Sequence, residues 1–109
     1  MRILLDNCVD QRLAVLLVPH EAIHARQVGW ADLSNGHLIS AAETANFEVM
    51  ITVDKNLRYQ QSLKNRTISI ITLDPVLVQF QHIKLLVPTV LKLLPDLQPG
   101  SFVSVCEPD

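Results

Sequence analysis

The sequence predicts an α/β protein, a three-layer α/β/α domain around a central, mainly parallel sheet of about five strands. Short segments with strand character alternate with segments whose apolar residues recur at helical spacing, five times along the chain. Two of the strand segments, VMITV and SIITL, are continuously apolar, which is typical of strands covered on both faces. This alternation favours parallel strands joined by right-handed crossovers.

Five segments have the composition of strands. The predicted strands are residues 2–5, 21–28, 48–53, 66–73 and 101–107. The first is too short for a helix and ends at Asp6. The second is expected at an edge of the sheet, because His24 and Arg26 share its polar face. The last follows Pro99 and Gly100.

Helical segments separate these strands. The predicted helices are residues 11–18, 37–47, 56–63 and 78–94. Asp10 suits the N-cap of the first helix and Pro19 ends it. Ser34 or Asn35 is expected to cap the second. Pro88 interrupts the last segment, which predicts either a kink or two shorter helices.

Composition indicates one folded domain, residues 1–109, with 49% hydrophobic residues and a net charge of −2. No apolar run approaches the ~20 residues of a membrane-spanning helix, so no membrane partner is expected. The apolar stretch at the N-terminus is too short for a signal peptide, which predicts a cytoplasmic protein. The two cysteines lack CxxC spacing and suit reduced thiols.

Two acids stand directly after predicted strands. Asp6 follows the first strand and Asp54 the third. Ligands of open parallel sheets bind beyond the carboxyl ends of the strands, so neighbouring strands one and three would bring both carboxylates together. Two close carboxylates repel unless a cation such as Mg²⁺ neutralises them. The alternative is that each Asp caps the helix after its strand.

A basic, amide-rich run follows Asp54. Four of the nine Lys and Arg residues lie within twelve positions after it: Lys55, Arg58, Lys64 and Arg66. Such a run suits a phosphate-backbone substrate. A solvated loop and helix face is the alternative.

Two blocks of sequence resemble a small bacterial branch of the PIN-like domains, close in type to VapC-like toxins. They are MRILLDNCVD and VGWADLSNGHLISAAETANFEVMITVDKNLRYQQSL, in which GWxxLSNG followed by TVDKNLRYQQ is the distinctive part. The resemblance implies an α/β/α fold and cleavage of single-stranded or structured RNA with Mg²⁺ or Mn²⁺. It assigns the metal-binding acids to Asp6 and Asp54, and it implies an antitoxin protein as partner.

The chain departs from this family at the start of its second helix. Relatives tend to read NGEL there, whereas this chain reads NGHL, with His37 in place of the acid. Glu43 is six residues further on, ~9 Å along a helix, and is a poor substitute. His37 is expected to act as a Mn²⁺ ligand or general base; an exposed helix-start histidine is the alternative. Asn7 stands where a further acid would strengthen the cluster.

The expected catalytic residues are therefore Asp6, Asp54 and His37, with Asp6 and Asp54 as metal ligands. Polar residues near the two strand ends are expected to contact RNA, since amides bind base edges and cations bind phosphates. They are Asn35, Lys55, Asn56, Arg58 and Gln61.

Other functions compete with a ribonuclease. A phosphoacceptor receiver domain also has acids after strands one and three, but it requires a Lys after the last strand, and SFVSVCEPD contains none. A PIN-like module that has lost catalysis and binds nucleic acid or protein stays open. The stripe of Ile83, Val87 and Val90 suits either the core or a homodimer contact.

Overall fold

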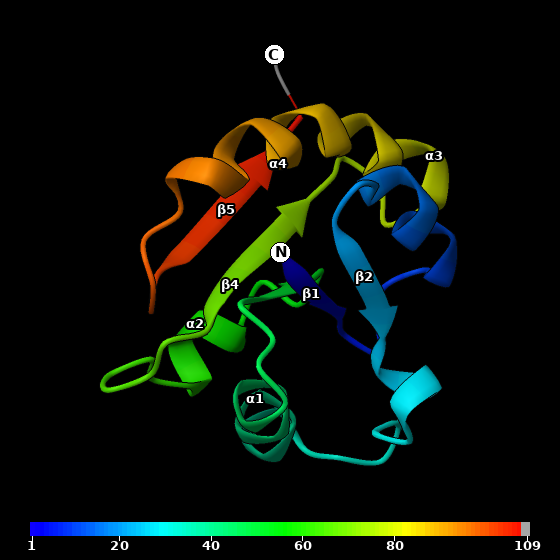
Figure 1. Cartoon of the computed structure of the whole chain (residues 1–109). Helices are drawn as coiled ribbons and strands as arrows, with labels where there is room; N and C mark the ends of the chain where they lie inside the picture. Colours follow the sequence, from blue (N-terminus) through cyan, green and yellow to red (C-terminus); the bar gives the residue numbers. More distant parts are fainter. Residues whose placement is uncertain (108–109) are drawn as a thin grey trace.

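The computed structural model describes residues 1–107, within which five parallel strands form one sheet (Figure 1). The strands are β1 (Arg2–Leu5), β2 (Glu21–His24), β3 (Val49–Thr52), β4 (Ser69–Asp74) and β5 (Phe102–Cys106). Their order is β2-β1-β3-β4-β5, so β1 lies beside β3 and β2 is an edge strand. The predicted parallel sheet is confirmed. The last two positions of the predicted domain, 108–109, lie outside the described residues.

Helices cover both faces of the sheet and complete the three layers (Figure 1). One face carries the helices η1 (Gln11–Leu17), α3 (Phe80–Ile83), η3 (Lys84–Leu86), α4 (Val87–Leu93) and η4 (Leu94–Asp96). The opposite face carries η2 (Ala25–Val28), α1 (Asn35–Thr44) and α2 (Leu57–Gln60). The η elements are 3₁₀ helices.

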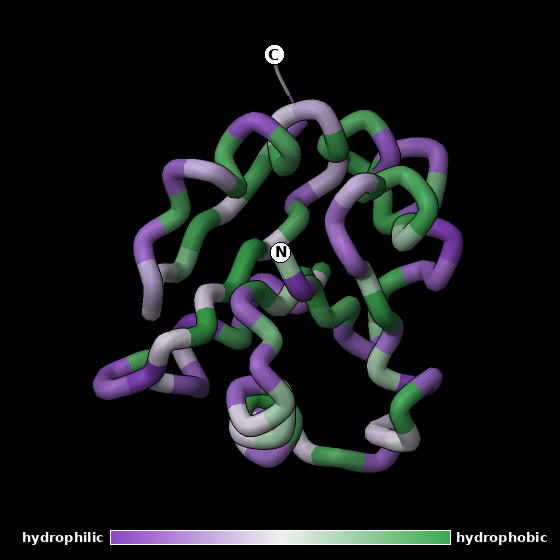
Figure 2. Tube along the Cα trace, viewed as in Figure 1, coloured by the Kyte–Doolittle hydropathy of each residue, from purple (hydrophilic) through white to green (hydrophobic). Residues whose placement is uncertain are grey.

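Consecutive strand residues are buried on opposite faces. In β1, Ile3 and Leu5 pack under α4, whereas Leu4 packs under α1. All three are fully buried, and burying each contributes about 1.5–3 kcal/mol relative to exposure. This explains why the strand segments are continuously apolar. Figure 2 shows β4 and β5 mostly in hydrophobic green, whereas the loop between α2 and β4 is mostly hydrophilic.

The second strand is shorter than predicted. Residues 21–28 were expected to be extended, but β2 ends at His24 and η2 follows. The His24 Nδ1 accepts a hydrogen bond from the Arg26 N–H at 3.1 Å, and the Gln27 side chain accepts one from the His24 N–H at 3.0 Å. These two capping bonds start a helical turn, so the polar residues of this segment serve as caps and not as a strand face.

Other element boundaries also differ from prediction. The helix predicted over 56–63 is the single turn α2, and the segment 78–94 divides into separate helices, as one of the two alternatives for Pro88 expected. Pro88 lies in the first turn of α4, where a backbone N–H has no partner within the helix, so the lack of an N–H in proline costs no hydrogen bond. Asp10 caps η1 as predicted, accepting from the Arg12 N–H at 2.9 Å.

The apolar stripe of Ile83, Val87 and Val90 belongs to the core. These side chains are 3%, 7% and 1% exposed and pack against the β1, β3 and β4 face. The stripe therefore offers no dimer contact. No helix in the described part of the chain is long and apolar enough to cross a membrane.

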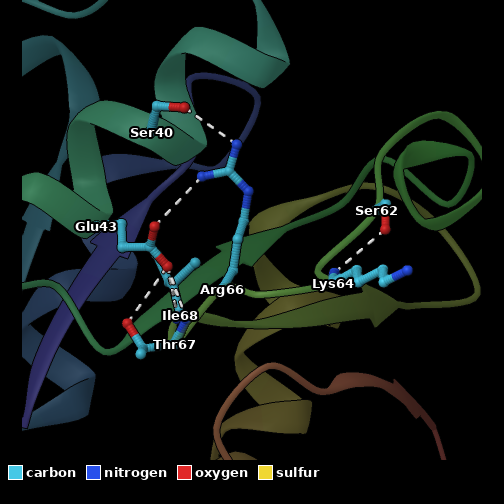
Figure 3. A network of polar contacts seen from close by, with 7 residues as sticks. All are labelled: Ser40, Glu43, Ser62, Lys64, Arg66, Thr67 and Ile68. Atoms are coloured by element: carbon cyan, nitrogen blue, oxygen red, sulfur yellow. Dashed lines mark hydrogen bonds and ion pairs between the residues drawn. The ribbon is translucent and has the colours of Figure 1, made fainter.

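Glu43 ties the end of α1 to the chain entering β4 (Figure 3). Its Oε2 accepts from the Thr67 N–H at 2.7 Å, the Thr67 hydroxyl at 3.3 Å and the Ile68 N–H at 3.4 Å. Arg66 completes the network with an ion pair at 3.5 Å to Glu43 and a bond at 3.1 Å to the Ser40 hydroxyl. Glu43 thus lies at the amino edge of β4, far along α1 from its start, as the sequence predicted.

Replacing Glu43 with Gln should lower the free energy of unfolding at pH 7 by about 1 kcal/mol, because a neutral amide oxygen accepts these bonds more weakly. The Thr67 N–H, followed by the Ile68 N–H and the Thr67 hydroxyl, lowers the pKa of Glu43 below its ordinary 4.5. The difference between parent and Glu43→Gln should therefore be full above pH 4.5 and disappear as pH falls through the lowered pKa. Urea unfolding across pH measures it. Asp32→Asn, at an exposed acid, is the control, and equal losses in both variants would contradict the role of Glu43.

Candidate functional site

Asp6 and Asp54 lie at the same carboxyl edge of the sheet. Strands β1 and β3 pair with Leu5 opposite Ile51, and the Asp6 N–H donates to the Ile51 carbonyl at 2.9 Å. Asp6 follows β1 directly, and Asp54 stands two residues after the end of β3. The expected adjacency of strands one and three is therefore confirmed.

The Asp6 carboxylate is buried and fixed by three donors. It is only 5% exposed. Its Oδ1 accepts from the Asn7 N–H at 2.7 Å, and its Oδ2 accepts from the Thr52 hydroxyl at 2.8 Å and from the Cys8 thiol at 3.5 Å. Hydrogen bonds of this kind hold the orientation of a buried carboxylate.

The hydroxyl of Thr52 connects the two acids. Thr52 is fully buried at the end of β3. Its Oγ1 donates to Asp6 Oδ2 and accepts from the Asp54 N–H at 3.1 Å. One hydroxyl thereby sets the position of a carboxylate from β1 and the backbone of the acid after β3. Sequence analysis missed Thr52, although the TxD pattern contains the signal.

Asp54 is half-buried and holds the turn that leads into α2. Its Oδ1 accepts from the Asn56 N–H at 2.9 Å, and its carbonyl accepts from the Leu57 N–H at 3.3 Å. The N-cap of α2 is Asn56, without a side-chain capping bond, so Asp54 closes the turn before the helix and is not its cap. Oδ2 of Asp54 accepts no hydrogen bond from residues 1–107, so one carboxylate oxygen remains for a ligand.

The strand register places further polar side chains beside this pair. Thr72 lies opposite Thr52, and Ser104 lies opposite Thr72, so hydroxyl residues continue the row across β4 and β5. The last residue of β4 is a third acid, Asp74, which the sequence analysis did not single out. Its Oδ1 pairs with the Lys55 ammonium at 3.3 Å. The ammonium group is thus held at the carboxyl edge, beside the turn of Asp54.

The start of α1 faces the same edge, because α1 runs antiparallel to the strands it crosses. Asn35 is half-buried and His37 is exposed. The Gln61 amide lies over Gly36, with Oε1 3.3 Å from the position a Cβ would take there. The first turn of α1 and the end of α2 are therefore in contact, which brings Gln61 beside Asn35 and His37.

The basic run after Asp54 does not form one patch. Lys55 pairs with Asp74 at the carboxyl edge, whereas Arg66 pairs with Glu43 at the amino edge. Arg58 donates to the hydroxyl of Tyr59 at 2.6 Å, and both side chains are exposed on α2. Of these cations, Lys55 is held at the carboxyl edge, whereas Arg66 has a structural role at the amino edge.

Cys8 adds a thiol to the site. Its Sγ lies 3.5 Å from Asp6 Oδ2 and 3.4 Å from the Thr52 hydroxyl. Burial raises the pKa of this thiol, the Thr52 hydroxyl and the Val53 backbone oppose that shift, and the negative charge of Asp6 adds to it. The thiol is therefore protonated at neutral pH and donates a hydrogen bond to Asp6 instead of acting as a nucleophile.

The oxygen donors at this edge are of the chemical kind that hard divalent cations prefer. Asp6 and Asp54 offer carboxylate oxygens, and Mg²⁺ commonly takes one or two carboxylates and completes its shell with water. No group of three or more His, Cys, Asp or Glu side chains able to hold a metal ion occurs in the described part of the chain. Asp6 and Asp54 are the candidate ligands for a metal ion at this edge.

Comparison of the chain with protein-family models, with curated proteins and with solved structures gives no match.

Thr52→Val should lower the free energy of unfolding by about 1–3 kcal/mol, because it leaves a buried Asp6 oxygen and the Asp54 N–H without their shared partner. Thr72→Val is the matched control, since Thr72 is also buried and its hydroxyl makes no hydrogen bond within residues 1–107. Urea unfolding of both variants makes the comparison. A loss at Thr72 as large as that at Thr52 would mean that the bridging hydroxyl has no special role.

Proposed function

We propose that the protein is a PIN-like ribonuclease that cleaves RNA phosphodiester bonds with Mg²⁺ or Mn²⁺ held by Asp6 and Asp54. The observation that carries the proposal is the Thr52 hydroxyl, which bonds to the Asp6 carboxylate and to the backbone of Asp54 at one sheet edge. The sequence resemblance supplies the substrate and the toxin–antitoxin setting, with an antitoxin as protein partner in the cytoplasm.

Electrostatics support a cation between these groups. Asp6 is buried beside Cys8 and Thr52, and Asp54 keeps one carboxylate oxygen without a protein donor. Two carboxylates at one edge favour binding of a divalent ion over binding of a neutral ligand. Bound there, Mg²⁺ or Mn²⁺ supplies charge neutralisation at the phosphate and activation of water.

The side chains around the acids have complementary roles in this proposal. The Lys55 ammonium, oriented by Asp74, attracts a phosphate of the RNA to the edge. Arg58 and the amides of Asn35, Asn56 and Gln61 bind the flanking phosphates, sugars and bases. His37 stands exposed on the first turn of α1, where its imidazole can exchange protons with substrate or solvent.

A binding module that lacks catalysis is the second candidate. It is favoured by the three hydrogen bonds that the two Asp6 oxygens already accept, and by the histidine in place of a third acid. Such a module would bind RNA through the same cations and amides without cleaving it.

Asp54→Asn should abolish metal-dependent cleavage of a mixed RNA pool, lowering the rate at least about 100-fold, because it removes the charge of one of two metal ligands. The amide oxygen can still accept from the Asn56 N–H, so the α2 turn and the thermal stability should be kept. Asp96→Asn, at an exposed acid of η4 on the chain leading to the start of β5, should cleave like the parent. RNA binding without cleavage by the parent, with Mg²⁺ and with Mn²⁺, would select the binding module.

His37→Glu should tighten Mg²⁺ binding, because a hard cation prefers oxygen to imidazole nitrogen and gains a negative ligand. A carboxylate in the first turn of α1 is also favoured by a few tenths to ~1 kcal/mol, so the fold should be kept. Calorimetric titration of parent and variant with Mg²⁺ and Mn²⁺ measures both affinities. Identical affinities in the two proteins would place His37 outside the metal site.

A further inference from the structure

The strand β5 forms one edge of the sheet, and its outer side carries a row of unpaired backbone groups (Figure 1). It pairs only with β4, with Phe102 opposite Ile70. The Ser101 carbonyl accepts from the Ile70 N–H at 2.9 Å, so alternate residues, starting with Ser101, direct their backbone groups to β4. The N–H and C=O groups of Phe102, Ser104 and Cys106 therefore point away from the sheet. They make no hydrogen bond within residues 1–107.

The strand at the other edge, β2, does not present such a row. The Glu21 N–H donates to the Met1 carbonyl at 3.0 Å, so the outward backbone groups of this four-residue strand belong to Ala22 and His24. The His24 N–H is already taken, because it donates to the Gln27 side chain at 3.0 Å. Ala22 is left with the one outward N–H of β2 that has no partner within residues 1–107.

None of the usual protections of an edge strand is found in β5. Lysine, proline and β-bulges keep other chains from pairing with an exposed edge. The strand reads FVSVC, without charge or proline, and its register with β4 runs uninterrupted from Phe102 to Cys106. The charged groups at its end are paired within the protein, Glu107 with His82 at 3.0 Å and Asp74 with Lys55 at 3.3 Å. A chain that approaches this edge therefore meets no charge on the strand itself.

A second copy of β5 in the antiparallel direction would satisfy the whole row. Directly opposite residues of an antiparallel pair exchange two hydrogen bonds when their backbone groups face each other. With Ser104 opposite Ser104 of the second copy, Phe102 lies opposite Cys106 and Cys106 opposite Phe102. All three outward residues of each copy then make both of their backbone bonds, and no other antiparallel register uses all three.

The side chains suit the same register. Val103 is half-buried, and it would lie opposite Val105 of the second copy. Pairs of β-branched side chains across two strands stabilise a sheet. The ring of Phe102 would lie beside the sulfur of Cys106, a favourable contact for a thiol. The strand is therefore complementary to itself in its hydrogen bonds, its charge and its side chains.

We infer that β5 is a homodimer contact, in which the strand pairs antiparallel with β5 of a second copy about a two-fold axis at Ser104. A five-residue strand is about 17 Å long, so the contact is smaller than a standard interface of about 1,600 Å². We therefore expect a weak dimer, with a dissociation constant in the micromolar range or above.

This dimer leaves both candidate sites accessible. The paired strands run in opposite directions, so the carboxyl edges of the two sheets, with Asp6 and Asp54, face opposite ways. Dimerisation requires neither a metal nor RNA and does not depend on the proposed function.

Sedimentation equilibrium of the full chain tests for the dimer. From about 1 μM to about 1 mM, the average mass should rise from that of one chain toward that of two. A monomer throughout this range would overturn the inference.

Charged variants of Ser104 test the two-fold axis. Ser104 is exposed, and Ser104→Lys or Ser104→Asp would place like charges opposite each other, so each should weaken dimerisation at least about tenfold. An equimolar mixture of the two variants should dimerise again, because Lys then lies opposite Asp. Thr44→Lys, at an exposed residue of α1, is the control and should dimerise like the parent. Thermal melts at low concentration check that each variant folds. Dimers that tolerate both Ser104 variants, or a mixture no stronger than either variant alone, would overturn the pairing.

Amide hydrogen exchange locates the contact. At about 1 mM, the N–H groups of Phe102 and Cys106 should exchange at least about tenfold more slowly in the parent than in Ser104→Lys, whereas that of Ala22 should exchange equally in both. Equal rates at Phe102 and Cys106 in the two proteins would place the contact elsewhere and reject β5 as the interface.

Discussion

The parallel pairing of β1 with β3 is the constraint on which the carboxyl edge depends. The pairing continues one residue beyond β1, through the bond from the Asp6 N–H to the Ile51 carbonyl. It sets the Asp6 carboxylate opposite the Thr52 hydroxyl, and Thr52 in turn fixes the backbone of Asp54. If this register shifted by one residue, the Asp6 side chain would point to the opposite face of the sheet. An apolar residue of β3 would then lie beside Asp6 in place of Thr52.

The fold sorts the charged residues of the central segment between two edges. Lys55 and Arg66 are eleven positions apart in a run that looks uniformly basic. The strand β4 begins near Arg66 and ends at Asp74, so the two cations meet acids at opposite ends of the same strand. The positive charge that a phosphate substrate would meet is therefore smaller than the sequence indicates.

The two residues that follow β1, Asp6 and Asn7, are bound to different parts of the fold. Asp6 is bound on the side of β3 by Thr52, whereas the Asn7 amide is bound to the loop after η2 through the Trp30 carbonyl. A carboxylate bound to Thr52 and an amide bound to Trp30 thereby lie next to each other in the chain. This arrangement explains why an amide, and not a further acid, suits position 7: a carboxylate there could not donate to Trp30.

The sequence by itself determined the layered α/β class and the approximate strands, because strands buried on both faces have continuous apolar runs. It also determined that both acids lie at strand ends, because each is the first charged residue after its apolar run. It also marked Asp10 and Pro88 correctly, since caps and prolines act through local backbone geometry. Only the tertiary structure decided what these residues contact. The early end of β2 follows from capping bonds among His24, Arg26 and Gln27, which are local but do not show in the strand-like composition of this segment. The bridging role of Thr52 and the pairing of Lys55 with Asp74 depend on groups distant in the chain. Their positions follow from strand order and register, which local sequence patterns do not encode.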